Sequence, residues 1–271
     1  MKAIMVGVDG SPEAKVAIQH AVEIAQLADA GITAVAAVFG DFDGEAESDE
    51  HAVEERESLE HLPATAVGWF QEALDECGEI CAVADVDFTA RLLAGKPAQV
   101  LVEEAQAVDM LMVGATGRGG ERNALLGQTA RRVIRNCIKP VLVTREEHQA
   151  IERIMVGYDG SPASGHALEW ASDMAAAGGW EVAIVTGAMP ESSLAEGADY
   201  AAKLVESRGL DPEVFLVNGD APSIIFAQAK KWDPDMIAIG GPQRGALSGF
   251  FLGESWPEVV EQAEAPVLRW R

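Results

Sequence analysis

Two stretches of the chain are near copies of each other: KAIMVGVDGSPEAKVAIQHAVEIA at Lys2–Ala25 and ERIMVGYDGSPASGHALEWASDMA at Glu152–Ala175. Each opens with the apolar run IMVG, which leads through one aliphatic or aromatic residue into Asp-Gly-Ser-Pro. The serine and the proline stand where an N-cap and a first-turn proline belong, and apolar residues at helical spacing follow them. The two copies therefore predict the same strand, tight turn and helix at two places in one chain.

Two further segments repeat in the same order. They are VDMLMVG at residues 108–114, matched by PDMIAIG at 234–240, and KPVLVT at 139–144, matched by APVLRW at 265–270. A repeat of this kind indicates a duplicated unit of ordinary domain size. We predict one domain at residues 1–147 and a second at 152–271, joined through the polar linker REEHQAIE at Arg145–Glu152.

Predicted strands and helices alternate within each unit. In the first unit the strands are expected at residues 3–8, 32–39, 86–95, 110–114 and 140–144, and the helices at 12–30, 53–76, 97–106 and 129–137. This alternation predicts an α/β fold of two tandem open parallel sheets, each covered by helices on both faces. Ligands of such sheets bind beyond the carboxyl ends of the strands, where Asp9 and Gly114 are expected to lie.

Composition excludes several classes of partner. The chain carries 44 acidic and 20 basic residues, a net charge of −24, which argues against nucleic-acid or anionic-membrane binding. Its apolar share of 48% suits a globular protein, and no apolar run approaches the roughly 20 residues of a membrane span. The start, MKAIMVGVDGS, lacks the layout of a signal peptide, so we expect a cytoplasmic protein.

The reactive residue types form no recognisable catalytic or metal-ligating motif. Cys77, Cys81 and Cys137 lack the partner ligands of a zinc site and are expected to be small buried side chains. None of the five histidines is expected at a strand end near the Gly114–Thr129 stretch, and the two Ser-Pro serines are explained as helix caps. We therefore expect no catalytic residue and no metal site, and we expect that the chain is not an enzyme.

A glycine-rich stretch, GATGRGGERNALLGQT at Gly114–Thr129, follows the apolar run MLMV. Its glycines free backbone N–H groups to turn inward, and the helix predicted after Gly127 offers its N-terminus to an anion. Six basic residues and a single acid, Glu121, lie between Arg118 and Lys139. The stretch is neither a Walker loop nor a G-x-G-x-x-G turn, so it predicts a phosphate site of another kind.

The spacing Gly114-x2-Gly117-x9-Gly127 resembles the nucleotide motif of the universal stress protein (UspA-like) family, and DGSP, DMLMVG and KPVLVT match as well. The resemblance covers both units in tandem and implies a Rossmann-like fold of the adenine nucleotide alpha hydrolase type. It also implies ATP, with or without Mg²⁺, as the ligand. The roles carried over fall on Gly7, Val8 and Asp9 for adenine, on Val38 as its backbone partner, and on Val113, Gly114, Gly117, Arg118, Gly119, Gly127, Gln128 and Thr129 for phosphate and ribose.

The family motif has serine or threonine at position 128, where this chain has Gln128, with Thr129 one step later. The second unit departs further, because Gln243 replaces the middle glycine and Glu254 follows Gly253. A carboxylate at that helix start competes with phosphate for the same dipole. We therefore predict that only the first unit binds a nucleotide.

The resulting hypothesis is a stress-response regulator that binds ATP in its first domain. By resemblance the last strand of each unit pairs the two domains within the chain, and a homodimer is a further expected partner. Two alternatives stay open: an interaction module that binds no nucleotide, which Gln128 favours, and a slow ATPase.

Overall fold

The computed structural model describes residues 1–39, 59, 62–118, 125–187, 191–217, 219–241 and 256–271. The first domain contains β1 (Ala3–Gly7), α1 (Pro12–Ala28), β2 (Gly31–Val38), α2 (Ala64–Val83), β3 (Phe88–Ala94), α3 (Pro97–Glu104), β4 (Met110–Gly114), α4 (Gln128–Asn136) and β5 (Val141–Thr144). The second contains β6 (Arg153–Gly157), α5 (Pro162–Gly178), β7 (Glu181–Thr186), α6 (Glu191–Glu206), β8 (Glu213–Leu216), α7 (Ala221–Trp232), β9 (Met236–Gly240), α8 (Trp256–Gln262) and β10 (Val267–Trp270). The predicted α/β class is confirmed.

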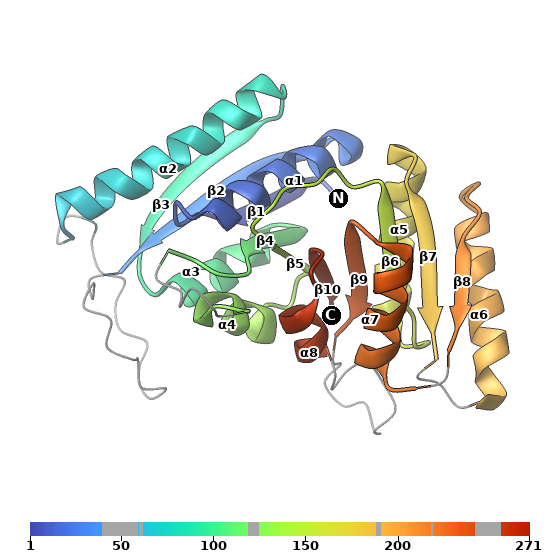
Figure 1. Ribbon diagram of the computed structural model, residues 1–271. Coiled ribbons are helices and arrows are strands. Elements are labelled where there is room, and N and C mark those ends of the chain that lie inside the picture. Colours follow the sequence, from blue (N-terminus) through green and yellow to red (C-terminus); the bar gives the residue numbers. More distant parts are fainter. Residues whose placement is uncertain (40–58, 60–61, 119–124, 188–190, 218, 242–255) are drawn as a thin grey trace.

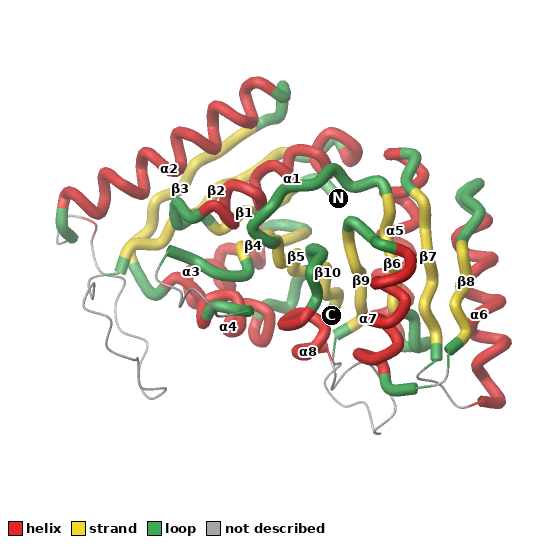
Figure 2. The backbone as a smooth tube through the Cα atoms, viewed as in Figure 1, coloured by secondary structure: helices red, strands yellow, loops and turns green. Residues whose placement is uncertain are grey.

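The ten strands of the described residues form one sheet in the order β3-β2-β1-β4-β5-β10-β9-β6-β7-β8. Strands within each domain are parallel, and the two halves meet where β10 runs antiparallel to β5, with Leu268 opposite Leu142. Figures 1 and 2 show helices on both faces of this sheet. Each half has the same strand order, so the duplication in sequence becomes a two-fold repeat in space.

The apolar residues of the strands alternate between two cores. Ile4 and Val6 of β1 belong to a core that also contains buried residues of α1, α2, α5 and α6, whereas Met5 belongs to a second core that contains buried residues of α3, α4, α7 and α8. This alternation follows from the period of two in a strand, and it explains why the strand signals are runs of apolar residues. No helix in the described part of the chain is long and apolar enough to cross a membrane.

The Asp-Gly-Ser-Pro turns start their helices as the repeat predicts. The Ser11 hydroxyl accepts a hydrogen bond from the Ala14 N–H at 3.2 Å, and Ser161 accepts one from the Ser164 N–H at the same distance. Each serine is thus a side-chain N-cap, with a proline at the first helical position.

The second helix differs from its prediction, which placed it at residues 53–76. The described helix begins at Ala64, after Pro63, and continues to Val83. It passes Glu76 because Cys77 and Cys81 extend its buried face. Most of residues 53–61 lie outside the described part of the chain, so the predicted start is not tested there.

All three cysteines are buried and free. Burial raises the pKa of Cys77 to about 12 and that of Cys81 to about 11, so these thiols stay protonated at neutral pH. We expect the folded protein to be unreactive toward a thiol reagent at about pH 8, and three thiols per chain to react after unfolding in guanidinium. Rapid labelling of the folded protein would contradict this assignment.

Candidate functional site

A cavity of about 880 Å³ opens at the carboxyl ends of β1 and β4, beside β2. It lies at the point where strand order reverses, because the chain leaves β1 toward β2 on one side and later returns to β4 on the other. The volume falls within the roughly 300–1,000 Å³ of ordinary small-molecule sites. Its apolar lining comes from Val35, Ala37, Phe70, Leu101, Val113 and Leu126.

Most of the residues predicted to form the site lie together on this cavity. The lining includes Gly7, Val8, Asp9, Val113, Gly114, Gly117, Arg118, Gly127, Gln128 and Thr129. They come from the end of β1, the end of β4, the loop after it and the first turn of α4. The end of β1 is thus brought beside segments that lie more than a hundred residues later in the sequence.

Two predicted residues are not on the described lining. Val38 is fully buried beside Leu62 and Ala94, and its carbonyl accepts a hydrogen bond from the Gly95 N–H at 2.8 Å. Ala37, one residue earlier in β2, lines the cavity instead. Gly119 lies outside the described residues.

Two glycines are required by close contacts at the edge of the cavity. A Cβ on Gly114 would lie 2.6 Å from the Glu13 Cβ and 3.0 Å from the Thr116 carbonyl oxygen. A Cβ on Gly117 would overlap the Asp9 carboxylate. The loop after β4 therefore packs against the turn after β1 with no room for side chains at these positions.

Asp9 accepts hydrogen bonds both from the turn after β1 and from the loop after β4. Its Oδ1 accepts hydrogen bonds from the Ser11 N–H at 3.0 Å and the Ser11 hydroxyl at 2.6 Å. Its Oδ2 accepts one from the Arg118 N–H at 3.1 Å. A carboxylate has about four lone-pair sites, so Asp9 retains capacity for a further donor in the cavity.

An aromatic–arginine stack lies at the rim of the cavity, and the sequence reasoning missed it. The Arg118 guanidinium carbon is 3.7 Å from the centroid of the Trp69 ring, a cation–π contact. The same ring lies against Gly10, where an added Cβ would be 2.6 Å from the indole Nε1. Trp69 is 40% exposed, and the next residue of α2, Phe70, lines the cavity. The sequence signal that could have indicated this contact is the pair of adjacent aromatic residues, Trp69 and Phe70, near the start of an amphipathic helix.

The first turn of α4 supplies polar groups to the lining of the cavity. Gly127 is its N-cap and has no side chain to satisfy the first N–H groups of the helix. Gln128 and Thr129 are exposed and line the cavity together with Ala130. The helix start thus presents backbone donors, an amide and a hydroxyl to the same space, an arrangement suited to an anion.

The dense run of basic residues in this region does not converge on the cavity. Among its described members only Arg118 lines the cavity, and Arg122 lies outside the described residues. Arg131 points toward the second domain, where its guanidinium pairs with Glu261. Among the described residues, the positive charge offered to a phosphate is therefore that of Arg118 and of the α4 N-terminus.

The matching place in the second domain is arranged differently. Asp159 is only 2% exposed, and its Oδ1 accepts a hydrogen bond from the Ser161 N–H at 2.9 Å. Gly240 keeps the close approach of its counterpart Gly114, because an added Cβ would lie 2.6 Å from the Ser164 nitrogen. The predicted departures at Gln243 and Glu254, and the retained Gly253, lie outside the described residues.

Comparison with known proteins places the chain in a family. The model of the "Universal stress protein family" matches residues 1–145, 150–203 and 187–271. A universal stress protein of Methanocaldococcus jannaschii is 33% identical over 144 residues, covering 52% of this chain and 80% of that protein. One of Mycobacterium tuberculosis is 25% identical over 303 positions, covering 98% of this chain and 93% of that protein.

A solved structure agrees in fold over the whole chain. The crystal structure of a universal stress protein from Archaeoglobus fulgidus superposes with a TM-score of 0.78 at 17% identity, covering 99% of this chain and 98% of that one. The chain belongs to the universal stress protein family, as a tandem of two domains.

Proposed function

We propose that the first domain binds one adenine nucleotide, with ATP as the principal ligand, and that the protein acts by regulation rather than catalysis. The observation that carries this proposal is the cavity at the strand switch point, whose lining combines apolar side chains with Arg118 and the α4 N-terminus. A nucleotide likewise combines an apolar base with an anionic phosphate chain.

The lining suggests how the two ends of the ligand would be held. Val35, Ala37 and Leu101 offer apolar contact to a purine, with the Asp9 carboxylate near enough to the strand end to accept from an exocyclic amine. The phosphates would meet the N–H groups of the first turn of α4 and the Arg118 side chain. Mg²⁺, when it accompanies ATP, neutralises part of the phosphate charge.

Of the elements around the cavity, the loop after β4 is the one whose conformation a bound nucleotide would change. The backbone N–H of Arg118 donates to Asp9, and the Arg118 side chain stacks on Trp69. A bound phosphate competes for the same guanidinium, so its arrival would change the contact between the loop and α2. We propose that this change alters which partner the protein contacts during stress.

The second domain is proposed to serve as a structural partner that binds no nucleotide. The buried Asp159 and the pairing of β10 with β5 support this division of labour. A homodimer of the tandem chain remains part of the proposal.

Binding is tested by intrinsic fluorescence, because Trp69 stands at the rim of the cavity. We expect ATP to change the emission in a saturable way, with GTP at least about tenfold weaker, since adenine and guanine differ in their exocyclic groups. Trp69→Phe should lose most of the signal while calorimetry still detects binding. Mass spectrometry of the denatured protein is expected to identify co-purified adenine nucleotide.

The alternatives have distinct outcomes. A protein that carries no nucleotide and gives no ATP titration signal is an interaction module, and the proposal fails. Phosphate release that needs Mg²⁺ and is lost in Gly117→Val would identify an ATPase and overturn the non-catalytic role. The valine is chosen because a side chain at that position overlaps Asp9.

A further inference from the structure

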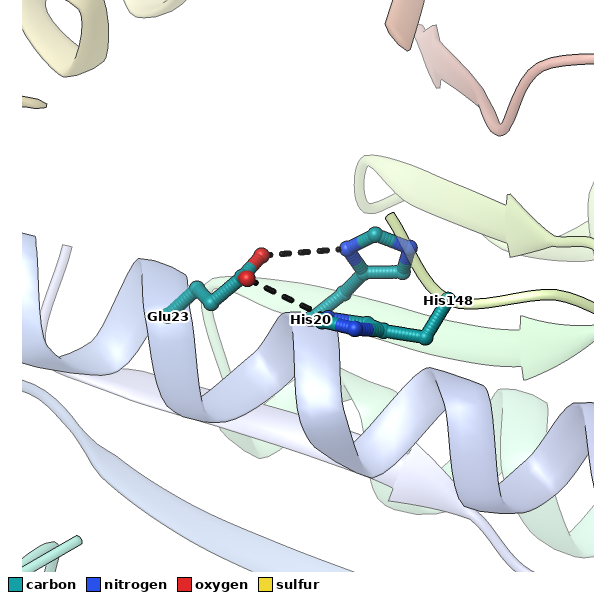
Figure 3. A group of neighbouring side chains, drawn as sticks. All are labelled: His20, Glu23 and His148. Atoms are coloured by element: carbon teal, nitrogen blue, oxygen red, sulfur yellow. Dashed lines mark hydrogen bonds and ion pairs between the residues drawn. The ribbon is translucent and has the colours of Figure 1, made fainter. Parts of the chain in front are cut away.

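Two histidines and a glutamate meet where the linker between the domains crosses α1 (Figure 3). His20 and Glu23 are on α1, and His148 is in the linker, 128 positions after His20 in the chain. The His20 Nδ1 lies 3.2 Å from the Glu23 Oε2, and the His148 Nε2 lies 3.1 Å from the Glu23 Oε1. The three potential ligand atoms are all within 4.8 Å of one another.

His20 is an unusual residue for its place in the core. It is 0% exposed and is packed among the apolar residues of α1. Its Nε2 is buried and has no hydrogen-bond partner within the described residues. Within the described residues, the ring pairs with Glu23 through Nδ1 and lies against the His148 ring, with the two ring centroids 4.7 Å apart.

The duplicated domain shows that the fold itself does not need an imidazole here. Alignment of the Ser-Pro turns places Trp170 of α5 at the position of His20, and Asp173 at that of Glu23. Trp170 is buried and lies 6.4 Å from the Trp270 ring, while Asp173 pairs with Arg208. In the second domain a large side chain is enough to fill this position. In the first domain the same position belongs to a cluster of residue types that bind metal ions.

We propose that His20, Glu23 and His148 bind a divalent transition-metal ion, for which Zn²⁺ is the natural probe. Two imidazole nitrogens and one carboxylate oxygen are a known ligand set for Zn²⁺, with the fourth position left to water. Ligands about 2.1 Å from a tetrahedral ion are about 3.4 Å apart. The three ligand atoms here lie within 4.8 Å of one another, so they need to approach by at most about 1.4 Å. A movement of the linker at His148 can bring them together.

Hydrogen bonding at the far side of the rings sets the expected affinity. A carboxylate only accepts, so each ring directs an N–H group at Glu23. When the nitrogen that faces Glu23 binds a metal, the ring's remaining N–H group is the one on its other nitrogen. For His20 that nitrogen is Nε2, which has no acceptor within the described residues. We therefore expect a dissociation constant on the order of micromolar rather than that of a closed structural site.

The ion would fasten the two domains together. The linker is also held to the second domain, because the Gln149 side chain donates to the Asp235 Oδ1 at 2.6 Å, one residue from His148. A metal at His148 adds the corresponding attachment to α1 of the first domain. The site is separate from the cavity described above, so it does not depend on nucleotide binding.

The test is a calorimetric titration of untagged, nucleotide-free full-length protein with Zn²⁺ after treatment with a chelator. We expect one ion per chain, and binding weakened at least about tenfold in both His148→Ala and Glu23→Gln. His166→Ala, a histidine of α5 outside the cluster, is the matched control and should bind within about twofold of the wild type. The variants alter the linker or a half-buried side chain, so circular dichroism should confirm that they fold.

Substitution by Co²⁺ gives a second readout. The wild type should develop visible absorption bands of an ion with nitrogen and oxygen ligands, and His148→Ala should lose them. No Zn²⁺ binding by the wild type, or unchanged binding in both cluster variants, would overturn the proposed metal site. His20, Glu23 and His148 would then be a hydrogen-bonded cluster that binds no metal.

Discussion

Replacing Gly127 with glutamate is expected to weaken ATP binding at least about 100-fold, or about 2.7 kcal/mol. Gly127 is the N-cap of α4, on the edge of the cavity where the first N–H groups of the helix meet the proposed phosphates. A carboxylate there occupies the favourable end of the helix dipole and repels the phosphate charge. Isothermal calorimetry with ATP measures the loss.

Gly127→Ala separates charge from backbone effects at the same position. Its φ of −72° suits any residue, and an added Cβ would lie 3.5 Å from its nearest neighbours, an ordinary contact. We expect the alanine variant to bind ATP within about threefold of the wild type, since the N–H donors remain. Equal losses in the two variants would show that the helix N-terminus does not bind the phosphates through its field.

Replacing Arg269 with alanine is expected to lower the free energy of unfolding by about 3 kcal/mol. Arg269 is on β10 and only 1% exposed, and its guanidinium donates to the Cys137 carbonyl at 2.9 Å and the Lys139 carbonyl at 3.1 Å. Both acceptors belong to the first domain, at the junction of β5 and β10. The substitution leaves a cavity and two carbonyls without this donor. Denaturant unfolding measures the change.

Arg271→Ala is the matched control for this junction. Its guanidinium also points at first-domain carbonyls, those of Asn136 and Cys137, but at 3.4 Å and 3.3 Å and in a more exposed setting. We expect Arg271→Ala to lower the free energy of unfolding by less than about 1 kcal/mol, because water can take the place of a donor that is already solvated. Burial lowers the pKa of Arg269 to about 10, so that side chain is still charged at pH 7. Similar losses in both variants would contradict the role given to burial.

The parts of the fold that the sequence predicts are those fixed by local patterns. Apolar runs ending at Asp9 and Gly114 mark strands, and the Ser-Pro pairs at Ser11 and Ser161 mark helix starts, because a capping hydroxyl acts within three residues. The end of α2 at Val83 could not be read in this way. It depends on Cys77 and Cys81 packing against the sheet, which is a tertiary contact.

The candidate site shows the same difference between features set by local patterns and features set by tertiary contacts. Its glycines could be located from spacing, but the stack of Arg118 on Trp69 joins residues 49 apart in a helix and a loop. The density of basic residues along the chain also suggested more positive charge at the cavity than the described residues place there. Arg131 belongs to that run of basic residues, but it pairs with Glu261 of the other domain. His20 and His148 gave no motif at all, because only the path of the linker brings them together.

We propose that one of the two domains binds an adenine nucleotide. The most direct measurement is a calorimetric titration of the full-length chain with ATP in the presence of Mg²⁺. We predict saturable binding of one ATP per chain. No measurable binding, or two equivalent sites per chain, would contradict the account.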